Sequence, residues 1–135
     1  MTKYFLPLFF IALSFTSFAQ KEYKPTKIGI VKEFTGNISG SFQYDNDAFF
    51  WINHPQLGKI TFYFLNGRCS AGEDKYALPI KISDELREKF FSENEWKNLK
   101  IKVTAKSSYG IFCGGDSGIE KKVLIWRPIV VTLVN

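Results

Sequence analysis

The sequence is poor in the residues from which most metal and redox sites are built. It holds one histidine, His54, and two cysteines, Cys69 and Cys113. A zinc or copper site needs several His or Cys ligands at set spacings, and these three residues are too few and too scattered to supply them. The carboxylate spacing and closing glutamate of an EF-hand calcium loop are also missing. We therefore expect neither a metal ion nor any other cofactor.

A single histidine also limits the chemistry available to an enzyme. The string GDSG at 115–118 is similar to the motif around the nucleophile of chymotrypsin-like proteases. Such a serine needs a histidine base that is oriented by a buried aspartate. His54 stands beside Pro55 in a predicted hairpin loop, and the residues that should surround a catalytic histidine are absent. We expect a glycine-rich turn at 115–118 and a protein that is not an enzyme.

Charge of one sign does not accumulate along the chain. The net charge is +5, and no block of five like charges occurs. An excess this small is consistent with weak attraction to anionic surfaces, but it does not indicate a protein that binds nucleic acid. The sequence therefore predicts no nucleic-acid partner.

The longest apolar run lies at the N-terminus. Lys3 supplies a positive charge, residues 6–18 are almost wholly apolar, and Ser17 and Ala19 are small residues placed as in a cleavage site. The run is short for a membrane-spanning helix, which needs about 20 residues. We expect a secretory signal peptide over 1–19, with an uncleaved anchor as the alternative. A single domain over 20–135 would follow, periplasmic or secreted, with no membrane span after cleavage.

Export would place both cysteines in an oxidising compartment. An isolated pair most often forms one bridge there, and the C-x-x-C spacing of a redox pair is absent. The sequence predicts a structural disulfide between Cys69 and Cys113. On the chain-entropy model such a bridge would stabilise the fold by about 4 kcal/mol.

Strand-forming residues dominate the rest of the chain, where Phe, Tyr, Trp, Val, Ile and Thr are plentiful. Turn residues divide them into predicted strands at 27–42, 48–53, 59–65, 77–82, 100–106 and 128–134. Ser83 can cap a helix that continues, with a step at Ser92, to about Leu99. Residues 109–113 and 121–126 are expected to form a hairpin-like excursion around a glycine-rich loop at 114–118.

Three main strands, a helix and two further strands follow the chain order of an OB-fold barrel. The strings LKIKVTAK at 99–106 and WRPIVV at 126–131 resemble the fourth and fifth strands of small exported bacterial OB-fold proteins of unknown function. The resemblance implies a mainly β fold, a five-stranded OB-fold-like barrel with one helix between strands three and four. The alternatives are a β-sandwich, which the helix argues against, and an open lipocalin-like barrel, for which the strands are too few.

The second and third strands carry aromatic residues on both faces. Alternation puts Phe49 and Trp51 on the face opposite Phe50 and Ile52, and Tyr63 would join the first pair. OB folds bind ligands on the face of these two strands and in the adjoining loops. The predicted ligand-binding residues are Phe49, Trp51, Lys59, Tyr63 and Arg68. The alternative is that these aromatic side chains are buried beneath neighbouring segments.

Two functions are consistent with these features. The first is an exported, non-enzymatic binding module for a glycan, a peptide or a protein, which would use the aromatic face of strands two and three. The alternative is a small inhibitor or immunity-type protein that blocks an envelope enzyme through the 107–122 loop.

Overall fold

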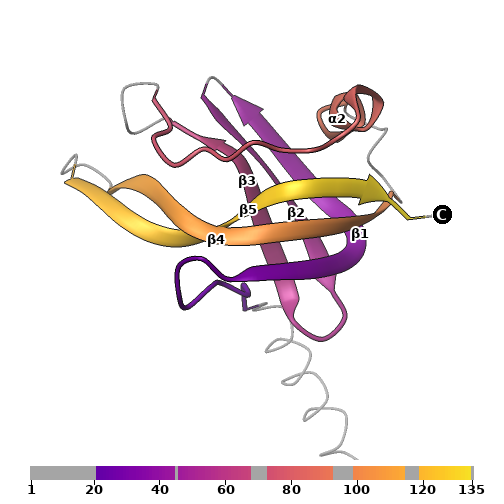
Figure 1. The fold of residues 1–135 in the computed structure, drawn as a ribbon, viewed down its shortest axis with the longest axis horizontal. Coiled ribbons are helices and arrows are strands. Elements are labelled where there is room, and N and C mark those ends of the chain that lie inside the picture. The colour runs from indigo at the N-terminus through magenta and orange to yellow at the C-terminus, as the bar shows by residue number, and fades with distance from the viewer. Residues whose placement is uncertain (1–20, 45, 68–72, 93–98, 115–118, 135) are drawn as a thin grey trace, which may run out of the picture.

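Five strands close into a barrel, with a helix at one end (Figure 1). The computed structural model describes residues 21–44, 46–67, 73–92, 99–114 and 119–134. Its elements are β1 (Val31–Tyr44), β2 (Asp47–His54), β3 (Gly58–Asn66), α2 (Asp84–Phe90), β4 (Lys100–Gly114) and β5 (Ile119–Leu133). The strands pair in the order β1-β2-β3-β5-β4. This order, with the helix between β3 and β4, is that of an OB fold, so the predicted fold class is confirmed.

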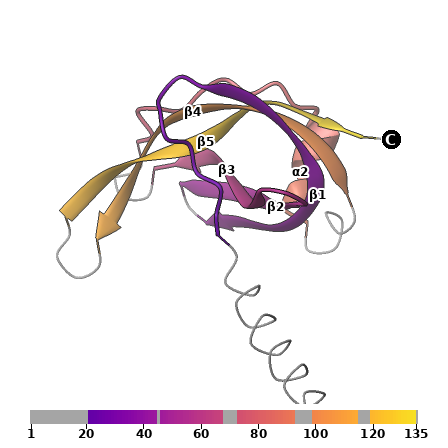
Figure 2. The ribbon, with the colours of Figure 1, turned by 90° about the horizontal axis from the view of Figure 1, so that it is seen from below.

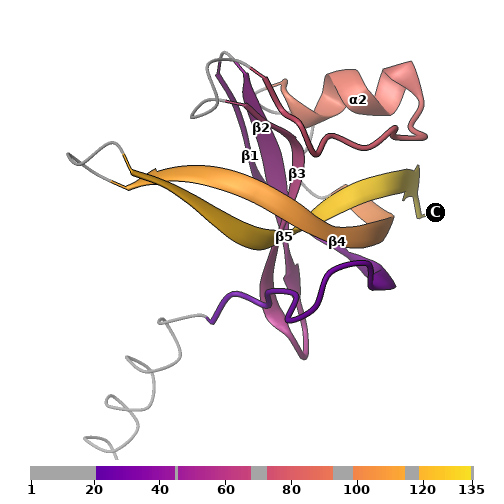
Figure 3. The same cartoon turned by 60° about the vertical axis from the view of Figure 1, so that its left-hand side comes forward.

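The inner faces of β2 and β3 form the centre of the core. Alternation along these strands buries one set of side chains, namely Ala48, Phe50, Ile52, Ile60, Phe62 and Phe64. Phe50 stacks on Phe90 of α2, with 4.5 Å between the ring centroids. The helix therefore covers one end of the barrel, as Figure 3 shows. The predicted inward faces of both strands are confirmed.

Helix α2 begins as predicted and ends earlier. Ser83 Oγ accepts a hydrogen bond from the Leu86 amide at 3.1 Å, which makes it the N-cap. The helix ends at Phe90, because the Phe91 amide donates a hydrogen bond to the Glu88 carbonyl at 3.3 Å. The predicted step at Ser92 and the continuation toward Leu99 depend on residues 93–98, which lie outside the described part of the chain.

Two predicted strand segments are wrong. Residues 27–30 form a turn before β1, because Gly29 takes a positive φ of 83°. Ser107 Oγ fixes that turn by donating to the Lys27 carbonyl and accepting from the Ile30 amide. Residues 77–82 contribute only an isolated bridge at Lys81, since Pro79 has no amide hydrogen to continue a ladder.

The predicted hairpin-like excursion is confirmed, and it is a direct extension of the last two strands. β4 and β5 pair from Ile101–Leu133 to Gly114–Ile119. Their outer halves, residues 108–114 and 119–125, form a twisted ribbon that projects beyond the barrel (Figures 1 and 3). We call this ribbon the arm. Ser108, Gly110 and Gly114 have the composition of a loop, yet all three pair with β5.

The barrel closes at a narrow contact between β3 and β5. These parallel strands pair at Phe62–Trp126, and the register between them extends no further in the described residues. Beside this contact the Asp74 carboxylate accepts from both Arg127 Nη atoms, at 2.7 and 2.8 Å. It also accepts from the Asn66 amide at 2.9 Å, and Arg127 donates to the Tyr109 carbonyl at 2.9 Å. The ion pair thus links β3, β4 and β5.

Removing one member of this pair should destabilise the fold strongly. The side chains of Arg127 and Asp74 are 1% and 7% exposed, so Asp74→Ala would leave a buried guanidinium without its counter-charge. We expect a loss of about 3–5 kcal/mol in the free energy of unfolding, measured in urea. The exposed pair Lys102–Glu33 supplies the control, and Glu33→Ala should cost less than about 1 kcal/mol.

The double variant Asp74→Ala/Arg127→Met separates charge burial from packing. It should be more stable than Asp74→Ala alone, because it buries no unpaired charge. If the losses in the free energy of unfolding of the two single variants simply add in the double variant, this account is contradicted.

Candidate ligand-binding face

A connected set of aromatic rings lies on the outside of the barrel, and we call it the aromatic face. Phe49 of β2 is its centre, with ring centroids 5.0 Å from Phe42, 6.1 Å from Trp51 and 5.1 Å from Tyr63. Phe112 from the arm meets Tyr63 edge-on at 5.7 Å and 82°. The structure therefore brings together the predicted Phe49, Trp51 and Tyr63, and adds two rings that the sequence reasoning missed.

The aromatic face is partly open to solvent. Phe42 is 37% exposed, and the other four rings are partly buried against one another. These rings point away from Phe50 and Phe62 of the core. The alternative predicted from the sequence, burial beneath neighbouring segments, holds in part, because Phe112 of the arm packs on Tyr63.

Trp51 owes its position to a glycine on the neighbouring strand. Gly40 pairs with Trp51 next to a register shift in β1. A Cβ atom at position 40 would lie only 2.0 Å from the indole ring, so the ring can cover the β1 backbone only because residue 40 is glycine. Lys59 Nζ lies 4.8 Å from the centroid of the same ring, within the range of a cation–π contact.

Lysines border the aromatic face on three elements. Lys59 extends from β3, and Lys121 of the arm pairs with Phe112, which puts the two side chains on one face of the ribbon. Lys24 lies in residues 21–25, which we call the strap. The predicted Arg68 lies outside the described residues.

Tyr63 has an unusual proton affinity because of its surroundings. Burial, together with the nearby Glu22 and Asp47 carboxylates, raises the pKa of Tyr63 from its ordinary value of 10.0 to about 12. The phenol therefore remains a neutral hydrogen-bond donor over the physiological pH range.

This shift predicts a stability change in alkali. Between pH 10 and about 12 Tyr63 stays protonated in the folded protein but ionises in the unfolded chain. The free energy of unfolding should therefore fall as the pH rises through this window. Tyr63→Phe lacks the proton, so the stability advantage of wild type over the variant should shrink from pH 10 to 12. A difference that stays constant across the window would contradict the assignment.

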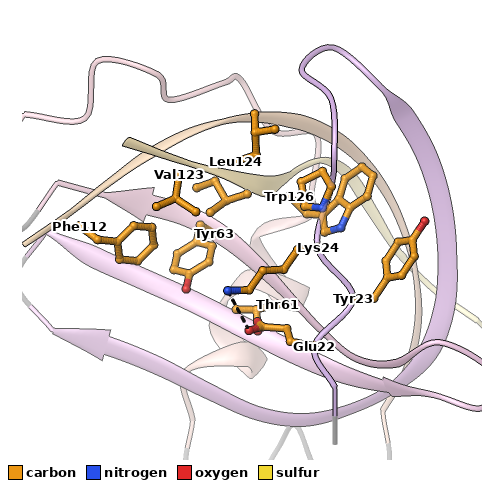
Figure 4. Close-up of a pocket in the computed structure, with 11 residues that line it drawn as sticks. Glu22, Tyr23, Lys24, Thr61, Tyr63, Phe112, Val123, Leu124 and Trp126 are labelled. Carbon is orange, nitrogen blue, oxygen red and sulfur yellow. Dashed lines mark hydrogen bonds and ion pairs between the residues drawn. The ribbon is translucent and has the colours of Figure 1, made fainter. Parts of the chain in front are cut away.

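A pocket of about 160 Å³ adjoins the aromatic face where β3 and β5 diverge (Figure 4). The strap runs along one side of it, held by the Tyr23 amide, which donates to the Lys59 carbonyl at 2.8 Å. Thr61 Oγ1 also donates to Glu22 of the strap at 2.5 Å. We call it the strap pocket, and its lining residues include Glu22, Lys24, Thr61, Tyr63, Phe112, Val123 and Trp126.

Residues considered for metal, redox or catalytic chemistry are not gathered at this face. Across the described ranges no cluster of His, Cys, Asp and Glu could hold a metal ion. His54 Nδ1 accepts from the Gln56 and Leu57 amides, at 3.2 and 3.1 Å, and so shapes the β2–β3 turn. The GDSG string at 115–118 lies outside the described part.

Cys113 lies near the end of β4 and is not a free thiol. Its expected partner, Cys69, belongs to residues 68–72, which are not described. The Cys69–Cys113 pairing therefore stays a prediction.

The signal peptide over 1–19, and the domain boundary that depends on it, also fall outside the described residues. Among the helices of the described part, none is long and apolar enough to cross a membrane.

No family model and no curated protein matches this chain. Two solved structures are similar to it, both crystal structures of Rim1, a mitochondrial single-stranded DNA binding protein from S. cerevisiae. The first is 14% identical, with a TM-score of 0.44, over 79% of this chain and 95% of the other. The second is 15% identical, with a TM-score of 0.41, over 81% and 98%. Similarity at this level concerns the fold.

Measured against these neighbours, several predictions made from the sequence are wrong. The neighbours bind single-stranded DNA and are mitochondrial. The predicted exported module for a glycan, peptide or protein and its inhibitor alternative disagree with that description. The predicted exclusion of nucleic acid and the periplasmic or secreted location disagree with it as well. The narrower resemblance to small exported bacterial proteins gains no support from them.

The physical reasons for these errors can be named. The exclusion of nucleic acid used the net charge of the whole chain, whereas a strand is bound by local rings and nearby lysines. The location was inferred from residues 1–19, which the structure does not describe.

Proposed function

We propose that this chain is a non-enzymatic protein that binds single-stranded nucleic acid across the aromatic face. The observation that carries the proposal is the contact of five rings outside the core, with Phe49 at their centre and Lys59 over Trp51. Proteins that bind single strands combine ring surfaces on which bases stack with cations that follow the phosphates. Both components occur here on adjacent strands.

The arrangement favours a single strand over a duplex. In a duplex the faces of the bases are covered by their neighbours, so protein rings can stack only on bases that are unpaired. The rings from Phe42 through Phe49 and Tyr63 to Phe112 form a continuous series from β1 to the arm. Several successive bases can therefore contact the same surface.

The lysines predict a moderate dependence on salt. Lys24, Lys59 and Lys121 border the rings on the strap, β3 and the arm. Three phosphate contacts on a single strand correspond to a slope of about −2 in a plot of log affinity against log salt concentration. Stacking supplies the remaining affinity, which salt changes little.

Truncation of the central ring tests the proposal. Phe49→Ala removes the ring that contacts three others, and base–ring stacking contributes about 1–3 kcal/mol per base. We expect the affinity for a fluorescently labelled oligothymidylate, measured by polarisation, to fall by about 5- to 150-fold.

Tyr76→Ala provides the matched control. Tyr76 packs on Tyr109, which by strand alternation lies on the face of the arm opposite to Phe112. Its truncation also removes an aromatic ring, but it should leave the affinity unchanged. Failure of the wild-type protein to bind the oligonucleotide, or equal losses in both variants, would contradict the proposal.

A further inference from the structure

We infer that the strap pocket receives one base of the bound strand and selects guanine, through the Glu22 carboxylate and the ring walls of Tyr63 and Phe112. This inference rests on the proposed function and deepens it by naming a base preference. The pocket opens beside the aromatic face, and Tyr63 belongs to both. A strand stacked on Phe49 can therefore place its next base in the pocket.

The pocket has the walls that a planar ring requires. Figure 4 shows Phe112 and Tyr63 on one side, Val123 above them, and the strap residues Glu22 and Lys24 on the other side. The rings of Phe112 and Tyr63 stand almost perpendicular, so a flat ligand can stack on one and meet the edge of the other. The volume of about 160 Å³ suits a single heterocycle.

The polar groups of the pocket are fixed before any ligand arrives. Glu22 accepts a hydrogen bond from Thr61 at 2.5 Å, and its second oxygen lies 3.8 Å from Lys24 Nζ. Thr61 is buried, so the hydroxyl anchors the carboxylate on the β3 side of the pocket. Trp126 also lines the pocket, and its buried Nε1–H has no hydrogen-bond partner within the described residues.

This set of groups matches the edge of guanine best. An ionised carboxylate accepts hydrogen bonds only, and it can take two from adjacent donors. Guanine offers such a pair in N1–H and the N2 amino group, and its O6 next to them suits a lysine ammonium. Adenine and cytosine place a ring-nitrogen acceptor beside their amino group, and thymine has one N–H between two carbonyls. Each of these edges would turn a lone pair toward Glu22.

Substitution of one base tests the preference. Two labelled strands would be compared by polarisation, an oligothymidylate and the same strand with one central guanine. We expect the guanine strand to bind about tenfold more tightly, which is within the range for a bidentate contact to a base. Glu22→Gln keeps an acceptor for Thr61 but presents an amide, so it should abolish the difference in affinity between the two strands.

Glu33→Gln is the matched control for the charge. Glu33 lies on β1 in an exposed ion pair with Lys102, so this variant also loses one carboxylate, but away from the pocket. It should preserve the guanine preference. Equal affinity of wild type for both strands, or a preference that survives Glu22→Gln, would overturn the inference.

A mononucleotide separates this inference from the proposed function. Guanosine monophosphate should bind to wild type more tightly than thymidine monophosphate in calorimetry, and Glu22→Gln should remove the difference. If neither strand binds but this pattern holds, the proposed function fails and the pocket assignment stands. If oligothymidylate binds but neither guanine probe is preferred, the pocket assignment alone fails.

Discussion

The buried pair of Arg127 and Asp74 is the interaction on which the rest of this structure depends. β3 and β5 close the barrel through a single parallel pairing, Phe62–Trp126, which is a narrow seam for a closed sheet. The guanidinium and carboxylate reinforce it through two short hydrogen bonds, and each ion also reaches backbone groups, at Tyr109 and Asn66. A buried charge is tolerated only when it is paired and hydrogen-bonded. The carboxylate pairs with both Nη atoms of the guanidinium, so the seam carries no unpaired buried charge.

The geometry of that seam determines where the arm and the strap pocket lie. Tyr109 belongs to the first part of the arm, so the Arg127 contact fixes the direction in which the ribbon leaves the barrel. Asn66 Oδ1 accepts from the Ile111 amide at 2.6 Å and adds a second connection from β3 to the arm. Phe112 follows directly and meets Tyr63. On the other side of the seam the strap lies along β3, as the view in Figure 2 shows. Folding and the candidate site thus depend on the same contacts.

The sequence predicted the parts of the fold that follow from local periodicity. Alternation separated Phe50 and Ile52 from Phe49 and Trp51, and the Ser83 cap marked the start of the helix. The arm was predicted as a hairpin-like excursion, but the sequence did not show that it continues β4 and β5 without a break.

Only some residues of the candidate site could be predicted from the sequence, for a related reason. Phe49, Trp51 and Tyr63 share a face by strand alternation, which can be read from the sequence. Phe112 and the strap join them only because the barrel closes, and no periodicity relates residues so far apart in the chain. Gly40 illustrates the same limit. Its role under Trp51 becomes visible only once the register between β1 and β2 is known.

The central claim is that the aromatic face is where a single strand of nucleic acid binds. The most direct measurement is a titration of isotope-labelled protein with oligothymidylate, followed through the ring and amide resonances. The account predicts that the resonances of the five rings shift together, namely Phe42, Phe49, Trp51, Tyr63 and Phe112, while those of α2 stay in place. Shifts confined to α2, or no shift at the five rings with the oligonucleotide in excess, would contradict it.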